Sequence, residues 1–311
     1  MQRLFTGLQP SGALHLGNYF GVLKPLVTMF ENHTGLVMVA DYHALTSLKD
    51  GPKLREYTFD VVRDYLAVGV DPTKATIFQQ SQVQEHTELA WIFECLITVS
   101  TLELSHAYKD KVAKGIEANA GLFNYPMLMA ADILLYDTDI VPVGADQRQH
   151  VEYAREAAAK FNNAFGETFK EPQELINETV AIIPGIDGKK MSKSYGNTIP
   201  LFGSKDEIAK AVMSIVTDSS GDVPQNVYAI HKYFRDEASL ATLYEANKGK
   251  YKALKDALVE DIEDLIGPMR AKRESITDAD VIRVLKDGSD KAREQASAKM
   301  RDVRTKIGIS L

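Results

Sequence analysis

The sequence holds a single cysteine, Cys95, among its 311 residues, so no disulfide bond can form within the chain. No apolar run approaches the roughly 20 residues that a membrane-spanning helix needs. The first residues lack the charged and apolar regions of a secretion signal. Internal repeats and low-complexity segments are also missing. We therefore expect a cytoplasmic protein that does not enter a membrane, and the length suggests about two domains.

Excess positive charge is missing as well. The net charge is −7, which as a total argues against a nucleic-acid partner. Residues 270–311 nevertheless hold 11 Lys or Arg against 7 Asp or Glu. A basic end on an acidic body fits local contact with RNA, and it fits an ordinary amphipathic helix equally well.

Neither common phosphate-binding fingerprint occurs, because the chain has no GxxxxGK[ST] loop and no GxGxxG turn after a strand. Another Gly-rich turn takes that position. A short apolar strand at residues 4–8 is followed by Gln-Pro-Ser-Gly at 9–12, and then by His-Leu-Gly-Asn at 15–18, where helical spacing begins. A helix start presents free N–H groups that bind phosphates readily.

A second polar segment, residues 188–196, reads Gly-Lys-Lys-Met-Ser-Lys-Ser-Tyr-Gly and is called the lysine loop below. Lys190 and Lys193 lie three residues apart among small hydroxyl side chains. Glycines make such a loop mobile, and lysines supply point charges that can follow an anion. A polyphosphate is the natural ligand, although a lone lysine cluster is more often a solvated surface loop.

Strands and helices alternate over the first 200 residues, which predicts a doubly wound parallel sheet. We expect strands at 4–8, 36–40, 75–80, 139–143 and 179–183, with helices at 52–68, 85–99, 124–136 and from 146 to 161. Helices alone are expected afterwards, at 206–215, 237–247, 252–265 and 283–305, and Gly267-Pro268 should end the third of these. Trp91 is expected in the core.

The helix at 124–136 should carry Pro126 in its first turn. Tyr125, Met129 and Asp132 then share one face, at i, i+4 and i+7. Asp132 lies in an apolar helix, where a carboxylate rarely stays without a partner. It could bind a ligand, or form a salt bridge with an arginine or cap a neighbouring element. Gly144 and Asp146, after the strand at 139–143, could approach a ribose, although Asp146 could be a plain helix cap.

These motifs together resemble the class I aminoacyl-tRNA synthetases, whose two signatures match residues 15–18 and 190–194 in order. The amino-acid sequence at residues 7–12, 17–19, 129–136 and 141–147 is similar to that of bacterial tryptophanyl-tRNA synthetases. The similarity is densest over residues 4–195. The family's second signature histidine is replaced by Asn18, which is usual for the tryptophan branch.

The resemblance implies a Rossmann-like catalytic domain over residues 1–200, with a connecting, dimer-forming segment at about 85–130, and an all-helical tRNA-binding domain over 201–311. It assigns catalysis to His15, Asn18, Lys190 and Lys193. The ATP site would comprise Gln9, Pro10, Ser11, Gly17, Asn18, Gly144, Ala145, Asp146, Ile182, Ile183, Lys190, Met191, Ser192, Lys193 and Ser194. The tryptophan site would comprise Phe5, His43, Tyr125, Met129, Asp132 and Gln147.

The activity implied is that of a tryptophan–tRNA ligase. It forms tryptophanyl-adenylate and pyrophosphate from L-tryptophan and ATP, and then charges tRNA(Trp). Mg²⁺ would be bound through the ATP phosphates, with no metal site in the protein itself, and the enzyme would be a homodimer. Asp132, with no other group to pair with, would accept the indole N–H and thereby exclude phenylalanine.

Three other interpretations stay open at this point. A tyrosine–tRNA ligase has the same fold and signatures. A small-molecule adenylyltransferase uses the same fold but needs neither Lys-Met-Ser-Lys-Ser nor a helical C-terminus. A non-catalytic tRNA-binding relative would not need to keep both ATP motifs.

Overall fold

The computed structural model describes residues 2–105, 108–109, 119–144, 148–176, 183–217 and 221–310. At its centre lies a five-stranded sheet in the order β3-β2-β1-β4-β5, and all neighbouring strands are parallel. The strands are β1 (Arg3–Leu8), β2 (Thr34–Val39), β3 (Ala75–Gln79), β4 (Ile140–Val143) and β5 (Gln173–Ile176). The predicted doubly wound parallel sheet is confirmed.

Four of the five predicted strands are present, and β5 was missed. Its sequence, Gln-Glu-Leu-Ile, has no apolar run of strand length, so pairing with β4 decides its conformation. The strand expected at 179–183 falls mostly on residues 177–182, which lie outside the described part of the chain.

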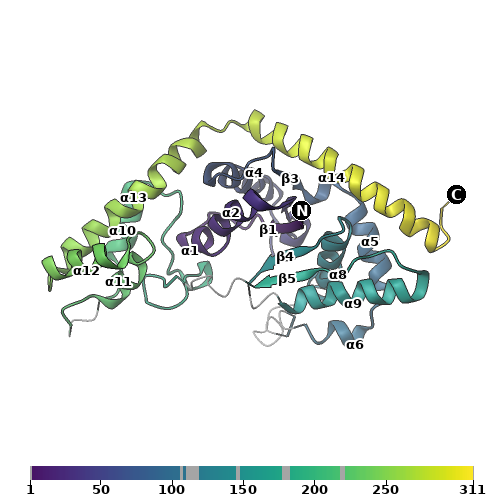
Figure 1. The fold of residues 1–311 in the computed structure, drawn as a ribbon, viewed down its shortest axis with the longest axis horizontal. Coiled ribbons are helices and arrows are strands. Elements are labelled where there is room, and N and C mark those ends of the chain that lie inside the picture. Colours follow the sequence, from purple (N-terminus) through teal and green to yellow (C-terminus); the bar gives the residue numbers. More distant parts are fainter. Residues whose placement is uncertain are drawn as a thin grey trace.

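Two hydrophobic clusters cover the two faces of the sheet. Alternate residues of the same strands enter different clusters: Leu4 and Val37 belong to one, and Phe5 and Leu36 to the other. Helices cover both faces (Figure 1). The helices in this part of the chain are α1 (Leu16–Asn18), a π-helical turn (Tyr19–Leu23), α2 (Lys24–Asn32), α3 (Asp41–Ala44), α4 (Gly51–Val68), α5 (Glu85–Glu94), α6 (Val99–Leu102), α8 (Ala120–Leu134) and α9 (Arg148–Phe165).

Three predictions about these helices were wrong. The predicted helix at 85–99 is interrupted, because α5 ends at Glu94 and α6 begins at Val99. Trp91 is not in the core, since 67% of its surface is exposed. Pro126 is not in a first turn. Asn119 caps α8 by accepting the Leu122 N–H at 2.9 Å, so Pro126 lies inside the helix.

The C-terminal third is helical, as predicted. Its helices are α10 (Lys205–Met213), α11 (Gln225–His231), α12 (Glu237–Ala246), α13 (Tyr251–Ser275) and α14 (Asp278–Lys306). Gly267-Pro268 does not end α13, which runs on to Ser275. Leu258, Ile262 and Ile266 are buried along one face, and this packing outweighs the hydrogen bond that one proline removes.

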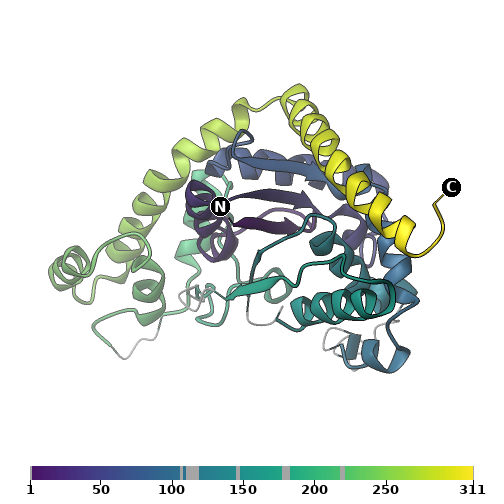
Figure 2. The ribbon, with the colours of Figure 1, turned by 45° about the vertical axis from the view of Figure 1, so that its right-hand side comes forward.

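The last helix does not stay with the other C-terminal helices. In Figures 1 and 2, α13 and α14 form two arms above the sheet, and α14 lies along β3. A side chain at Gly288 would place its Cβ 1.8 Å from the backbone oxygen of Ile77, so only glycine allows this close approach. The division at residue 200 remains a prediction, and α14 packs on the sheet rather than in a separate helical unit.

Candidate functional site

The Gly-rich turn lies at the carboxyl end of β1, beside the point where the strand order reverses between β1 and β4. Open parallel sheets bind ligands at such a point. Pro10 is buried there, while Gln9 and Ser11 are exposed. His15 precedes α1, and its backbone N–H donates to the Oδ1 atom of Asn18 at 3.0 Å. The turn therefore presents polar groups and a helix start at the same edge.

The lysine loop is held by a buried amide, Asn197, which is 2% exposed. Its Oδ1 atom accepts the N–H of Ser192 at 2.8 Å. Its Nδ2 atom donates to the backbone oxygen of Lys190 at 3.0 Å and to a carboxylate oxygen of Asp187 at 2.8 Å. The loop thus has a defined backbone shape, whereas the Lys190 and Lys193 side chains are exposed.

The structure brings these two motifs into contact. The N–H of Gly17 points to the sulfur of Met191 at 3.4 Å, and Met191 is buried in the core beneath the loop. The N–H of Met191 in turn donates to the backbone oxygen of Ile183 at 3.0 Å. Next to them, the N–H of Leu16 donates to Ile199 at 3.0 Å. The two motifs therefore lie in contact, and their joint use in one site remains a prediction.

Lys193 reaches across to the Gly-rich turn. Its ammonium group donates to the backbone oxygens of Gly12 at 3.0 Å and Ser11 at 3.3 Å. Burial of the imidazole, with the positive charge of Lys193 nearby, lowers the pKa of His15 to about 4. His15 is therefore a neutral imidazole at neutral pH, and its Nδ1 atom is buried without a hydrogen-bond partner among the described residues.

Among the described residues of the predicted tryptophan site, His43, Tyr125 and Asp132 lie together. Helix α8 begins at Ala120, before Tyr125, so Tyr125, Met129 and Asp132 share one face of the helix, as expected. His43 lies against this face: its Nε2 atom is 2.7 Å from Oδ2 of Asp132, and its ring lies edge-on to the ring of Tyr125 at 6.2 Å. Tyr125 also hydrogen-bonds to Nε2 of His150.

Asp132 itself differs from the expectation. It is fully buried, yet it has three partners among the described residues rather than none, and none of these three is an arginine. His43 binds Oδ2, while Oδ1 contacts Nδ1 of His86 at 2.6 Å and Nε2 of Gln80 at 2.8 Å. Burial alone would raise the pKa of this carboxyl group. Electrostatic interaction and hydrogen bonding with His43 and His86 outweigh burial and lower the pKa of Asp132 to about 2.

Three residues of this arrangement were missed at the sequence level: Gln80, His86 and Tyr136. Gln80 carried a usable signal, because it follows the apolar strand at 75–79 as His43 follows another. His86 and Tyr136 carried none. They lie in separate segments, and only the fold brings the Tyr136 hydroxyl to 2.8 Å from Nε2 of His86.

Other predicted site residues are less fully described. Gly144 follows β4 directly and is exposed, and Ile183 is buried. Phe5, on β1, is buried and stacks on Tyr136 at 5.8 Å. Ala145, Asp146, Gln147 and Ile182 lie outside the described residues, as does most of the connecting segment from 106 to 118.

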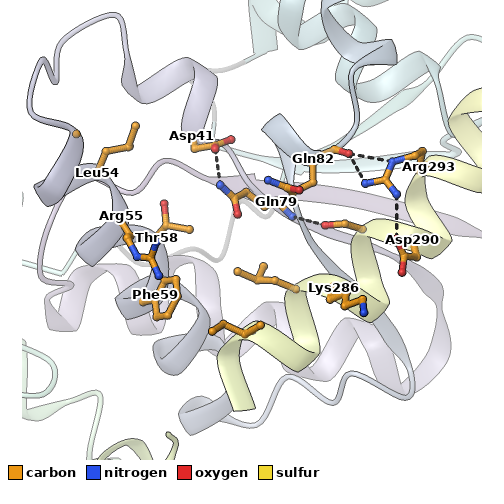
Figure 3. A pocket seen from close by; sticks show the side chains of 14 residues that line it. Asp41, Leu54, Arg55, Thr58, Phe59, Gln79, Gln82, Lys286, Asp290 and Arg293 are labelled. Atoms are coloured by element: carbon orange, nitrogen blue, oxygen red, sulfur yellow. Dashed lines mark hydrogen bonds and ion pairs between the residues drawn. The ribbon is translucent and has the colours of Figure 1, made fainter. Parts of the chain in front are cut away.

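A cavity of about 520 Å³ lies beside the predicted site but contains none of its residues (Figure 3). Helices α4 and α14, the first residue of α3 and the end of β3 line it. At its wall, Asp41 accepts from Nε2 of Gln79 at 2.7 Å and from the N–H of Ser81 at 3.0 Å. Gln80, between these two residues, points away from the cavity to Asp132. The end of β3 therefore contributes Gln79 to the cavity wall and Gln80 to the Asp132 carboxylate.

Within the described ranges of the chain, no group of three His, Cys, Asp or Glu side chains is arranged to hold a metal ion. Of the helices described here, none combines the length and apolar character required to cross a membrane.

Comparison with known proteins gave consistent matches. The family described as tRNA synthetases class I (W and Y) matches residues 1–280. A tryptophan–tRNA ligase of Fusobacterium nucleatum is 47% identical, over 99% of this chain and 98% of its own length. The crystal structure of a Campylobacter jejuni tryptophanyl-tRNA synthetase, complexed with ADP and tryptophan, superposes with a TM-score of 0.94 at 44% identity, covering 99% and 100% of the two chains. The Mycoplasma pneumoniae synthetase gives 0.87 at 32% identity, covering 100% and 98%.

Proposed function

Because the chain belongs to the class I tRNA synthetases of the tryptophan and tyrosine group, we propose that it is a tryptophan–tRNA ligase. It activates L-tryptophan with ATP, releases pyrophosphate, and transfers the tryptophanyl group to tRNA(Trp). The observation that carries the substrate choice is the buried, ionised carboxylate of Asp132 on the face that α8 shares with Tyr125 and Met129. The named relatives, at 32–47% identity, also favour tryptophan over tyrosine.

The nucleotide site in this proposal lies between the Gly-rich turn and the lysine loop. The helix start at Asn18 and the two lysines would bind the phosphates. In this chain Lys193 already crosses from the loop to the turn, so it can move onto a phosphate without a change of fold. Gln9, Pro10, Ser11 and Gly17 would line the site, and Mg²⁺ would arrive on the ATP phosphates.

The remaining nucleotide contacts are proposed for residues around β4 and the end of the lysine loop. Gly144, Ala145 and Asp146 would hold the ribose, and Ile182 or Ile183 would meet adenine through the backbone. The Ile183 oxygen accepts the Met191 N–H, so a backbone hydrogen bond joins Ile183 to the lysine loop.

The amino acid would lie against α8. Tyr125 and Gln147 would orient its ammonium group, Met129 and Phe5 would contact the indole ring, and Asp132 would accept the indole N–H. An indole nitrogen only donates, and an ionised carboxylate only accepts, so the pair is complementary. His43, already bonded to Asp132, would border the ring.

In the first reaction the tryptophan carboxylate attacks the α-phosphorus of ATP. The bond from that phosphorus to the bridging oxygen breaks, and pyrophosphate leaves. The substrate supplies the nucleophile, so the protein's task is alignment and charge stabilisation. Alignment can contribute roughly 7–11 kcal/mol, and each donor aimed at developing charge about 3–4 kcal/mol. A neutral His15 can donate a hydrogen bond without adding charge to the site.

ATP–pyrophosphate exchange with tryptophan and tyrosine in parallel tests this proposal. We expect exchange with tryptophan alone, followed by charging of tRNA(Trp). Asp132→Ala should abolish tryptophan-dependent exchange while changing the affinity for ATP much less. Exchange driven by tyrosine would support the tyrosine alternative, and unimpaired tryptophan exchange in Asp132→Ala would exclude the role given to this carboxylate.

The assembly and the tRNA contacts complete the proposal. Three large apolar side chains, Trp91, Val99 and Leu104, are 67%, 64% and 57% exposed within the segment expected to join two subunits. We propose that this segment forms a homodimer contact, since burial of apolar surface drives such association. The helical C-terminal region is proposed to bind tRNA.

A further inference from the structure

The carboxylate of Asp132 has unequal oxygens. An ionised carboxylate oxygen offers about two acceptor positions. Oδ1 uses both, one for Nδ1 of His86 at 2.6 Å and one for Nε2 of Gln80 at 2.8 Å. Oδ2 uses one of its positions, for Nε2 of His43 at 2.7 Å. Of the groups described here, only Oδ2 therefore retains an acceptor position for a ligand.

Both groups on Oδ1 are themselves held from behind. Gln80 is fully buried, and its Oε1 atom accepts the N–H of Tyr42 at 3.1 Å. This fixes which end of the amide faces Asp132, because the carbonyl oxygen is already engaged. The Nε2 group must then point its N–H to the carboxylate.

His86 is oriented in the same manner. Its Nδ1 atom faces an ionised acceptor, so Nδ1 carries the proton. On the opposite side Nε2 lies 2.8 Å from the hydroxyl of Tyr136, and a neutral imidazole accepts that O–H. Phe78 stacks on the His86 ring at 5.8 Å and packs edge-on to Tyr136 at 5.6 Å. His86, Tyr136 and Phe78 are each at most 1% exposed.

We infer that His86, supported by Tyr136, and Gln80 are positioning residues that set amino-acid specificity. By occupying Oδ1 they fix the plane of the Asp132 carboxylate and leave Oδ2, beside His43, as the acceptor for the indole N–H. This rests on the proposed function, because it assigns tryptophan to the face of α8. None of the three positioning residues touches the substrate.

The consequence concerns rejection of amino acids without an N–H donor. Phenylalanine would leave the open position of Oδ2 unpaired in a buried site, and such sites discriminate by about 10⁴–10⁵. That penalty requires a carboxylate that cannot turn to another donor. Without the two donors on Oδ1, the carboxylate can rotate until Oδ2 accepts a hydrogen bond from another group. Phenylalanine is then rejected less strongly.

The test is the ratio of kcat/KM for tryptophan to that for phenylalanine in ATP–pyrophosphate exchange. In His86→Asn the amide nitrogen lies where Nδ1 was and can still donate to Oδ1. In His86→Leu that donor is missing. We expect His86→Leu to lower the ratio about 10- to 100-fold, through a higher KM for tryptophan. His86→Asn should keep a ratio close to that of the wild type. The KM for ATP should not change in either variant.

Tyr136→Phe is the gentler variant, because it keeps the ring in the core and removes only the hydroxyl. It should lower the ratio in the same direction. In spectra of protein with ¹⁵N-labelled histidine, His86 should be protonated on Nδ1 in both proteins, because Asp132 still accepts that N–H. The Nε2 resonance of His86 should shift in Tyr136→Phe, where this nitrogen loses its hydrogen bond. An unchanged Nε2 resonance would show that Tyr136 does not hold the His86 ring.

The chain contains a matched control. His231 is fully buried, its Nε2 atom lies 2.7 Å from Oδ2 of Asp261, and its Nδ1 atom lies 3.3 Å from the hydroxyl of Tyr244. His231→Leu removes the same kind of triad from the C-terminal helices. It should lower the Tm but leave the tryptophan-to-phenylalanine ratio at the wild-type value.

The outcomes separate this inference from the proposed function. If His86→Leu and Tyr136→Phe keep the wild-type ratio while Asp132→Ala loses tryptophan exchange, the inference is wrong and the function stands. If the wild type shows no tryptophan exchange, both are wrong. If His231→Leu lowers the ratio as much as His86→Leu does, the effect is general destabilisation and the inference is again overturned.

Discussion

The sulfur of Met191 lies 3.4 Å from the backbone nitrogen of Gly17, although 174 residues separate them in the chain. This contact joins the helix start after β1 to the lysine loop. Met191 is 4% exposed, while Lys190 is exposed and Lys193 is bonded to the Gly-rich turn. The loop is therefore attached to the core at Met191, between its two signature lysines.

Gly17→Ala should disturb this contact. A Cβ at residue 17 would lie 2.9 Å from Nδ1 of His15 and 3.5 Å from Cβ of Met191, so His15 must shift. We expect a loss of about 1–3 kcal/mol in the free energy of unfolding and a higher KM for ATP in pyrophosphate exchange. Gly51→Ala is the control, because a Cβ there meets nothing within 4 Å. Equal effects of the two substitutions would contradict the packing argument.

Lys193→Ala should lower the turnover of adenylate formation. Lys193 reaches the Gly-rich turn, where the phosphates are proposed to bind, and removing one donor to developing charge typically costs about 10²–10³ in kcat. Lys189→Ala, in the same loop, should retain turnover, since the Lys189 backbone N–H that binds Asp187 is kept. A change in Lys193→Ala that is confined to KM would argue against a transition-state role.

Asn197→Ala should loosen the lysine loop. It removes the acceptor for the Ser192 N–H and the donor to the Lys190 oxygen. Leaving such groups unpaired costs about 1–3 kcal/mol. Urea unfolding should show this loss, and the KM for ATP should rise while the KM for tryptophan stays unchanged. The control is Asn247→Ala, at the C-terminal cap of helix α12 and outside the lysine loop, which should leave the KM for ATP unchanged.

His15 should make stability depend on pH. Its pKa falls from 6.5 in the unfolded chain to about 4 in the fold, so between these values only the unfolded state binds the proton. The free energy of unfolding should therefore decrease as pH falls from about 6.5 to about 4, at up to about 1.4 kcal/mol per pH unit. The decrease should be smaller in His15→Gln. Identical slopes in the two proteins would exclude a depressed pKa at His15.

Trp91 offers a test of the proposed dimer. It is the single tryptophan of the chain and 67% of its surface is exposed in the monomer. Burial in a subunit contact should shift its fluorescence to shorter wavelength, and dilution should reverse the shift. Sedimentation velocity should show Trp91→Glu as a monomer and Ile309→Glu, at another exposed apolar position, as a dimer. A wild type that sediments as a monomer at high concentration would exclude the contact.

Much of the fold could be predicted because strong local patterns coincide with it. The apolar runs at β1, β2, β3 and β4 and the helical spacing in α4 and α10 each agree with their final conformation. The predictions failed where packing overrides a local signal. Helix α13 continues through Gly267-Pro268 because its apolar face is buried, and β5 exists only because β4 pairs with it.

The sequence by itself determined which chemical groups this protein has and in what order they occur: a helix start after a Gly-rich turn, a carboxylate within an apolar helix, and a lysine loop. These signals are local, so they can be recognised from spacing alone. Only the tertiary structure decided how the groups meet. The fold brings Met191 to Gly17. It also surrounds Asp132 with His43, Gln80 and His86, because parallel strands place the segments that follow β2 and β3 at one edge of the sheet.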